Sequence, residues 1–156
     1  MNNKREHKIV IGRKDIADFP EIGFNQVEVK VDTGAYTSSI HCGFIQVKDD
    51  GKLYCSFLDE NHPEYSQETY CFSEFKTIRV KSSNGIAQNR YEINSIIRLF
   101  DKEYKISLSL SDRKDMKFPV LLGRKFLNPK FVVDPQLKDL SHKKEIYEYQ
   151  NIIKKS

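Results

Sequence analysis

The sequence predicts a mainly β domain that closes into a barrel. Several segments alternate apolar and polar residues with the period of two that is typical of half-buried strands, most clearly from Tyr104 to Leu110. Asp50-Gly51 and Asn84-Gly85 lie between such segments, and both pairs supply the positive φ angles that tight β-hairpins need. Helical periodicity is weak and is confined to the tail from Lys143 to Lys155.

The expected strands follow one another along the chain with short connections. Val27–Val31 alternates apolar and charged residues, whereas Phe118–Leu122 is a continuous apolar run. The polar stretch Asp59–Thr69 has neither period and is expected to be a loop. Lys125–Leu127 can form a short helical turn, which Pro129 ends. The expected strands are Lys8–Gly12, Val27–Val31, Phe44–Val47, Leu53–Phe57, Phe72–Val80, Arg90–Phe100, Glu103–Leu110, Phe118–Leu122 and Phe131–Val133.

Length and composition limit the classes of protein. Lys and Arg number 26 against 22 Asp and Glu, and this small, dispersed positive excess does not favour a nucleic-acid partner. Cys42, Cys55 and Cys71 form no C-x-x-C pair, so free thiols are expected. No stretch is apolar enough for a signal peptide or a membrane span, so we expect a cytoplasmic protein without a membrane partner. The expected boundaries are a single domain at 1–156, with a core at about 8–135 and a tail of helical character at 136–156.

One short segment has the composition of a catalytic site. The apolar residue Val31 leads into Asp32, Thr33 and Gly34, so a strand delivers a carboxylate, a hydroxyl and a glycine into a turn. A carboxylate that activates water must be ionised and the acid that polarises a carbonyl must be protonated, and two carboxyls sharing one proton supply both forms. Glycine lets two such turns approach closely, and Thr33 can hydrogen-bond across their junction. The chain holds one copy of the motif, so this chemistry requires two chains.

A second element lies about ninety residues further on. Pro119–Leu127 places two leucines and a glycine before a helical turn, which is the other recurring element of aspartic proteases. An Asn-Gly hairpin, the strand Arg90–Phe100 and the strand Glu103–Leu110 come between the two elements. This order resembles the retroviral protease subunit, in which a flap hairpin precedes the last strands. The resemblance spans about two thirds of the chain.

The sequence is still more similar to a bacterial and archaeal family of retropepsin-like proteins that are often labelled ATP-dependent zinc proteases. That family usually has Arg at the position of Tyr36, so a cationic contact near the site is missing here. The matching segments are Lys30–Ser39, Ser82–Gly85 with Arg90, Ser111–Arg113 with Met116, Leu121–Leu127, and Phe131–Pro135.

The resemblance implies an aspartic endopeptidase that acts as a C2 homodimer. Water held between two Asp32 carboxylates would hydrolyse a peptide or isopeptide-like amide, without a cofactor or a metal. The resemblance also implies an acidic or poly-glutamate substrate and a link to ATP-grasp ligases that append glutamate, because relatives are found beside such ligases. We further expect Arg124 to pair with Asp112 or Asp134. The implied residues are Asp32, Thr33 and Gly34 for catalysis, Ala35, Tyr36, Ser83, Asn84, Gly85, Arg90 and Arg113 for substrate binding, and Leu122, Gly123 and Arg124 for structural support.

Other classes of function remain open. A non-catalytic peptide-binding or regulatory domain of the same fold would need no turnover, although the intact Asp-Thr-Gly motif argues against it. A zinc protease is not favoured, because no His-Glu-x-x-His motif occurs and His7, His41, His62 and His142 are scattered. A thiol nucleophile at Cys42 with His41 as its base is not favoured, because neighbours on a strand point to opposite faces.

Overall fold

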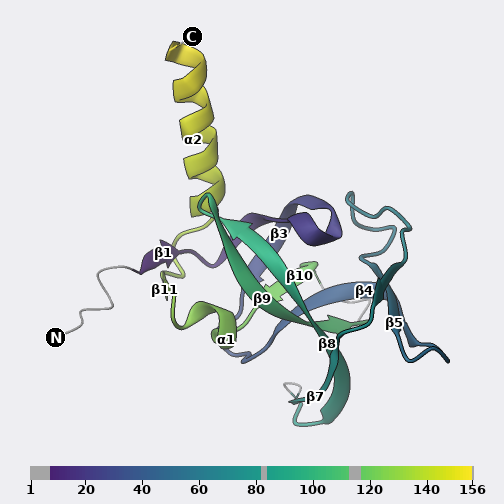
Figure 1. Ribbon diagram of the computed structural model, residues 1–156. Coiled ribbons are helices and arrows are strands. Elements are labelled where there is room, and N and C mark those ends of the chain that lie inside the picture. Colours follow the sequence, from purple (N-terminus) through teal and green to yellow (C-terminus); the bar gives the residue numbers. More distant parts are fainter. Residues whose placement is uncertain (1–7, 82–83, 113–116, 156) are drawn as a thin grey trace.

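The computed structural model describes residues 8–81, 84–112 and 117–155 of the chain (Figure 1). Strands are the main regular elements of this part, and a longer helix lies at its C-terminal end. In chain order the elements are β1 (Ile9–Ile11), β2 (Lys14–Phe19), the 3₁₀ turn η2 (Pro20–Ile22), β3 (Phe24–Val31), β4 (Ser38–Val47), β5 (Leu53–Phe57), β6 (Tyr70–Phe72), β7 (Lys76–Lys81), β8 (Ala87–Leu99), β9 (Lys102–Ser111), β10 (Val120–Leu122), α1 (Arg124–Leu127), β11 (Phe131–Val133) and α2 (Leu140–Lys155).

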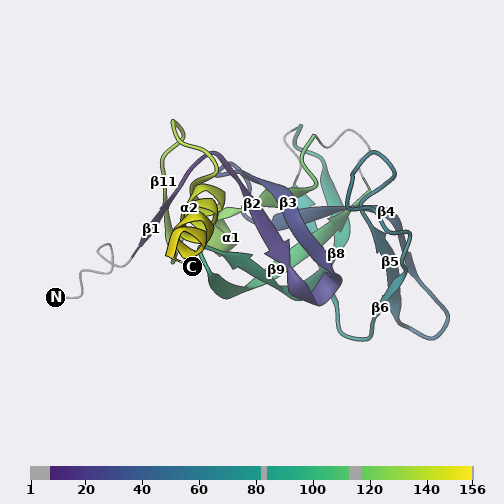
Figure 2. The ribbon, with the colours of Figure 1, turned by 90° about the horizontal axis from the view of Figure 1, so that it is seen from above.

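Six of the described strands close into a barrel, which confirms the predicted fold class. Neighbours pair in the order β10–β3–β2–β8–β9–β4, and β4 pairs in turn with β10 (Figure 2). Strand β10 is parallel to β3, with Leu122 opposite Val31, and antiparallel to β4, with Val120 opposite Ile40. Because β3 and β4 flank Asp32 in the sequence, one short strand holds the chain on both sides of this residue.

Further strands extend from the barrel. Strands β5 and β6 continue the sheet beyond β4, and Gly51, with a φ of 77°, turns the chain between β4 and β5 as predicted. Strand β7 pairs with the first half of β8 and forms a hairpin that projects from the barrel (Figure 1). Strands β1 and β11 form a separate parallel pair.

Alternation along the strands places the apolar side chains inside the barrel. In β3, Val27, Val29 and Val31 are buried, while Glu28 and Lys30 face solvent. Each large aliphatic side chain buried in this way contributes about 1.5–3 kcal/mol relative to an exposed one. Other buried aliphatic residues of the barrel strands include Ile40, Ile93, Ile97, Leu108, Val120 and Leu122.

Strand β2 is absent from the expected set because a charged residue occupies one of its inward positions. Asp15, Ala17 and Phe19 are buried and alternate with partly exposed residues, so the period of two is present but begins with a carboxylate. The Asp15 carboxylate accepts hydrogen bonds from the backbone N–H groups of Ser141 at 2.9 Å and His142 at 3.2 Å. A search for alternating apolar residues does not find a strand in which one buried position holds a hydrogen-bonded carboxylate.

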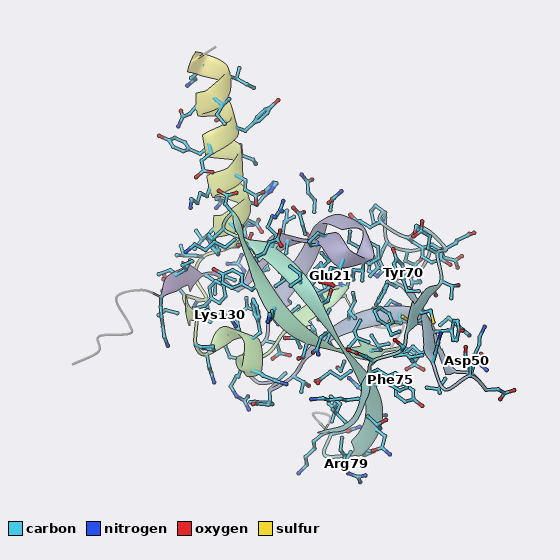
Figure 3. The ribbon with its side chains drawn as sticks, viewed as in Figure 1. Glu21, Asp50, Tyr70, Phe75, Arg79 and Lys130 are labelled. Atoms are coloured by element: carbon cyan, nitrogen blue, oxygen red, sulfur yellow. The ribbon has the colours of Figure 1, made fainter. Side chains whose placement is uncertain are left out.

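The expected strand Phe72–Val80 is wrong as a single element. The chain bends at Ser73, and β6 pairs with β5 whereas β7 pairs with β8. The Tyr70 hydroxyl donates to the Ile22 carbonyl at 2.9 Å and ties β6 to the 3₁₀ turn. Phe75 packs edge-on against Tyr91 and begins the hairpin, away from Tyr70 (Figure 3). A hydrogen bond of Tyr70 and an aromatic contact of Phe75 thus divide a sequence that reads as one strand.

Helix α2 occupies most of the predicted tail and projects away from the barrel (Figure 1). Asp15 holds its first turn, and the Ser141 hydroxyl accepts a hydrogen bond from the Phe100 N–H at 2.8 Å. Burial raises the pKa of Asp15, although the backbone N–H groups that it accepts oppose this shift. The apolar residues Ile146, Tyr147, Tyr149, Ile152 and Ile153 along the helix are exposed. Among the described residues, no helix is both long and apolar enough to cross a bilayer.

Candidate active site

The Asp-Thr-Gly loop forms where β3 leaves the barrel. The Asp32 N–H donates to the Leu122 carbonyl at 2.9 Å, so β10 fixes the point at which the strand ends. The Gly34 N–H donates to Asp32 Oδ1 at 3.1 Å and the Ala35 N–H donates to the Asp32 carbonyl at 3.2 Å, which closes a tight turn around the carboxylate. Asp32 is half-buried, and Thr33 and Gly34 are exposed. The carboxylate is therefore held by backbone groups but stays accessible from outside the barrel.

The residues that follow β10 hold this loop in place through hydrogen bonds. The Gly123 N–H donates to Ser38 Oγ at 3.0 Å, and the Arg124 and Lys125 N–H groups donate to the Ala35 and Tyr36 carbonyls, both at 2.9 Å. A Cβ atom on Gly123 would lie 2.6 Å from the Tyr36 carbonyl oxygen, a distance that real contacts do not reach. The φ of Gly123 is −94°, which suits any residue. Glycine is therefore required at this position by the close approach of the neighbouring backbone and not by its φ angle.

Arg124 binds the loop itself. Its Nη1 donates to the Thr33 carbonyl at 2.9 Å, and its guanidinium carbon lies 5.9 Å from the centroid of the Tyr36 ring, at the outer limit of a cation–π contact. The expected carboxylate partner is thus replaced, among the described contacts of Arg124, by a backbone carbonyl. Asp134 instead accepts the Gln136 N–H at 3.0 Å, and Asp112 is exposed. Arg124 thus contacts the Asp-Thr-Gly turn directly.

The expected substrate-binding residues fall into two groups. Ala35 and Tyr36 follow the Asp-Thr-Gly turn directly, and the Tyr36 side chain is 57% exposed. Asn84 and Gly85 form the end of the β7–β8 hairpin, where Gly85 has a φ of 83° and Asn84 Oδ1 accepts the Ile86 N–H at 3.3 Å.

Of the two arginines expected to face substrate, the structure describes one, Arg90. Arg90 lies on β8 opposite Ile78, within the same hairpin that carries Arg79 toward its end (Figure 3). Its Nη2 donates to Gln88 Oε1 at 3.4 Å. Arg90 therefore lies midway along the hairpin rather than at its end. Ser83 and Arg113, which the sequence also suggested for substrate binding, lie outside the described residues.

The thiol alternative has no support in the geometry of β4. Cys42 is fully buried, and burial together with the neighbouring Cys55 raises the pKa of its thiol well above the ordinary value. A nucleophilic cysteine needs the opposite shift, toward the thiolate. His41 is bonded to Asp59 rather than to Cys42.

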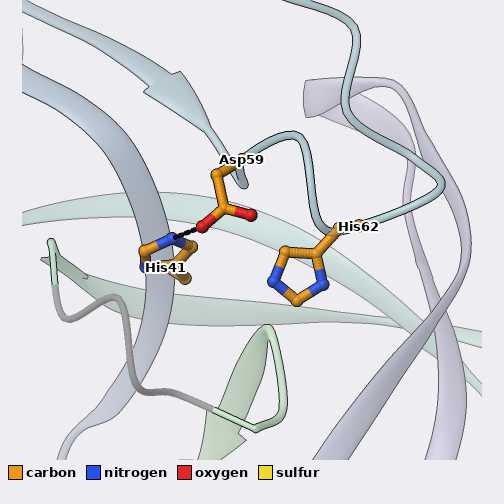
Figure 4. A group of neighbouring side chains, drawn as sticks. All are labelled: His41, Asp59 and His62. Atoms are coloured by element: carbon orange, nitrogen blue, oxygen red, sulfur yellow. Dashed lines mark hydrogen bonds and ion pairs between the residues drawn. The ribbon is translucent and has the colours of Figure 1, made fainter.

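A cluster of polar side chains that the sequence did not reveal forms around His41 of β4. His41 Nε2 is 2.7 Å from Asp59 Oδ2, and the His62 ring centroid is 5.9 Å from that of His41 (Figure 4). Burial opposes ionisation of Asp59, but the Asn61 N–H and the His41 ring outweigh it, so the pKa of Asp59 lies below its usual value. The histidines that appear scattered along the chain are thus partly brought together by the fold. No local spacing predicts this, since His41 and His62 are separated by a whole hairpin.

A closed barrel with an Asp-Thr-Gly loop tied to a Leu-Gly-Arg element defines a retropepsin-like protein. The family model described as "Retropepsin-like aspartic endopeptidase RimB" matches residues 10–144, and the chain belongs to this RimB-like family. The family resemblance that the motifs predicted is therefore confirmed.

Relatives of known name are longer proteins. A "Probable alpha-L-glutamate ligase" of Shewanella pealeana is 36% identical over 135 residues, which cover 83% of this chain and 29% of that protein. The protein of the same name from Shewanella halifaxensis is 37% identical over the same shares of the two chains. This chain thus spans less than a third of the length of these curated relatives.

A solved structure shares the fold. It is a Legionella pneumophila protein of unknown function, with a TM-score of 0.61 and 25% identity. The match covers 85% of this chain and 97% of that one.

Proposed function

We propose that this chain is an aspartic endopeptidase that works as a homodimer. The observation that carries the proposal is the state of Asp32: its backbone N–H is held by β10 and its carboxylate accepts the Gly34 N–H, yet the residue is only half-buried. Its second oxygen has no protein hydrogen bond within the described part of the chain. A carboxylate arranged in this way can share a proton with a second carboxylate from outside its own barrel.

The mechanism requires the two Asp32 residues to meet on a twofold axis. One ionised carboxylate removes a proton from water, while the protonated partner hydrogen-bonds the scissile carbonyl and donates its proton as the tetrahedral intermediate forms. The β7–β8 hairpin acts as the flap and excludes water from the bound peptide. The whole chain, residues 1–156, serves as one domain in this proposal, without a metal or cofactor in the reaction.

We take an acidic peptide as the substrate class. Arg90 on the flap strand and the relatives named as glutamate ligases support this choice. An ATP-grasp ligase that appends glutamate would be the functional partner, since one enzyme would make the bonds that the other hydrolyses. The free cysteines Cys42, Cys55 and Cys71 fit a reducing compartment such as the cytoplasm.

The test compares cleavage of mixed peptides and of poly-glutamate by the unmodified chain and by Asp32→Asn. Cleavage by the unmodified protein should persist with EDTA and should fall by at least about 10²-fold in Asp32→Asn. Asp49→Asn, which alters an exposed carboxylate in the β4–β5 turn, serves as the matched control and should cleave normally. Light scattering should give a dimer for all three proteins. Full activity of Asp32→Asn, or loss of activity with EDTA alone, would contradict the acid-dyad proposal.

A regulatory peptide-binding domain is the second candidate. It is favoured by the relatives, in which the matched region is 29% of a protein named for ligation rather than hydrolysis. Binding of poly-glutamate at equal affinity by the unmodified chain and by Asp32→Asn, with no cleavage by either, would support this role.

A further inference from the structure

The loop from Asp59 to Thr69 returns to the barrel at His41. The Leu58 N–H donates to the His41 carbonyl at 2.8 Å, and Leu58 bridges to Cys42, so the chain leaving β5 lies against β4. The His62 N–H then donates to the Asp59 carbonyl at 3.0 Å and turns the loop back toward the strand. These backbone contacts bring His62 and Asp59 to the buried ring of His41.

The three side chains converge on one point. One potential ligand atom from each of His41, Asp59 and His62 lies within 4.8 Å of the other two. In Figure 4 the Asp59 carboxylate lies next to His41, and the His62 ring lies across from it. Ligand atoms about 2.0–2.2 Å from a tetrahedral ion are about 3.3–3.6 Å apart. On this ligand geometry the 2.7 Å contact between His41 and Asp59 would widen by about 0.6–0.9 Å, and contacts as long as 4.8 Å would contract by up to about 1.5 Å.

A hydrogen bond between His41 and Asp59 does not account for the whole cluster. His41 is 2% exposed, and its Nδ1 has no hydrogen-bond partner among the described residues. This nitrogen is not the one that faces Asp59, and the His41–Asp59 bond alone gives no reason for a second imidazole at the same point. Asp59 Oδ1 already accepts the Asn61 N–H at 2.9 Å. This hydrogen bond orients the carboxylate, as neighbouring groups orient the ligands of metal sites.

We propose that His41, Asp59 and His62 bind one divalent transition-metal ion, with Zn²⁺ as the best chemical fit. Two imidazole nitrogens and one carboxylate oxygen suit zinc, and water completes its coordination. The ion fastens the 59–69 loop to β4 and stabilises the fold. The site is separate from the Asp32 loop and does not rest on the proposed protease function. Metal removal is therefore expected to lower the melting temperature but not the rate of cleavage at temperatures well below melting.

The test uses the full chain after metal removal with a chelator. Equilibrium dialysis with Zn²⁺ at neutral pH, and competition between Zn²⁺ and Co²⁺, measure the stoichiometry and affinity. The unmodified protein should bind one ion per chain, and Zn²⁺ should raise its melting temperature. Removing a ligand should weaken binding by at least about tenfold, since even the partners that orient metal ligands contribute 10–100-fold.

His62→Ala and Asp59→Asn are the informative variants, because both residues lie on the loop and are only partly buried. His142→Ala, at a histidine of α2 outside the cluster, is the matched control. The two loop variants should lose both zinc binding and the zinc-dependent rise in melting temperature, and the control should keep both. Absence of zinc binding by the folded, unmodified chain would overturn the proposal, as would unchanged binding in His62→Ala and Asp59→Asn. Asp32→Asn should bind zinc normally, so a failed protease assay would leave this result intact.

Discussion

The Asp32 loop and the His41 cluster are two polar sites on one barrel that are built by different means. The Asp32 loop is made by consecutive residues and by backbone hydrogen bonds to β10 and α1, and its side chain reaches solvent. The cluster of His41, Asp59 and His62 is made by side chains, and its central ring is buried. The first arrangement suits a group that must react with a substrate and a second chain. The second suits a group that holds the fold together.

The largest contrast is expected when one carboxylate is removed from each site. Asp32→Asn should lower peptide cleavage about 10²–10⁴-fold, the range of general acid–base catalysis, with little change in melting temperature. Asp59→Asn should leave cleavage per folded molecule unchanged, since this carboxylate is bonded to His41 and not to the Asp-Thr-Gly turn. A steady-state peptidase assay and a thermal melt on each variant measure both effects. If the Asp59 variant loses activity while it remains folded, the two sites are not independent.

Substitution of Gly123 tests how tightly the Asp32 loop is braced. Gly123→Ala would place a Cβ 2.6 Å from the Tyr36 oxygen, and overpacking of this kind costs about 1–3 kcal/mol. Because the displaced atoms belong to the loop, cleavage should fall together with stability, as measured by urea unfolding and peptidase assay.

Gly51→Ala is the matched control for Gly123→Ala. Gly51 has nothing within 4 Å of an added Cβ but has a φ of 77°, so its substitution strains the turn without touching the site. It should destabilise the protein by about 1–2 kcal/mol and leave cleavage intact. Equal loss of cleavage in the two variants would show that general stability, not the loop, is responsible.

The stability of the cluster should depend on pH in a known direction. The pKa of Asp59 is lowered in the fold, because the Asn61 N–H and His41 outweigh the effect of burial. Its contribution is therefore present above its unfolded pKa of about 3.9 and is lost as the pH falls through the folded value. In metal-free protein at neutral pH, Asp59→Asn should be less stable than the unmodified chain by about 1–3 kcal/mol in urea.

This difference should shrink below about pH 4, where the unmodified carboxylate also becomes protonated. Urea titrations at several pH values, with Asp49→Asn as the reference, measure the change. A difference that stays constant down to the acid transition would argue that the charge of Asp59 does not stabilise the cluster.

Arg124 should give the smallest effect. Arg124→Lys keeps the charge but loses the planar group that bonds the Thr33 carbonyl and lies 5.9 Å from the Tyr36 ring centroid. The expected loss of stability is about 0.5–1.5 kcal/mol, with a modest fall in kcat. Arg98→Lys is the control, because the exposed Arg98–Glu103 pair contributes about 0–1 kcal/mol. If kcat changes equally in both variants, Arg124 does not position the loop.

Much of the barrel could be predicted from the sequence, because half-buried strands and tight turns leave local signals. Strand β3 and the turn at Gly51 follow from alternation and from an Asp-Gly pair. Strand β2 does not, because Asp15 occupies an inward position where distant N–H groups of α2 help to satisfy its carboxylate. The bend between β6 and β7 also depends on distant partners, Ile22 for Tyr70 and Tyr91 for Phe75.

The sequence by itself determined the mainly β class, the family and the turn that presents Asp32, since each depends on residues that are neighbours in the chain. Only the tertiary structure decided that Arg124 bonds Thr33 and that His41, Asp59 and His62 meet. The physical reason is distance along the chain. Backbone turns are set by local φ preferences and hydrogen bonds, whereas side-chain clusters exist only after strand pairing brings separate segments into contact.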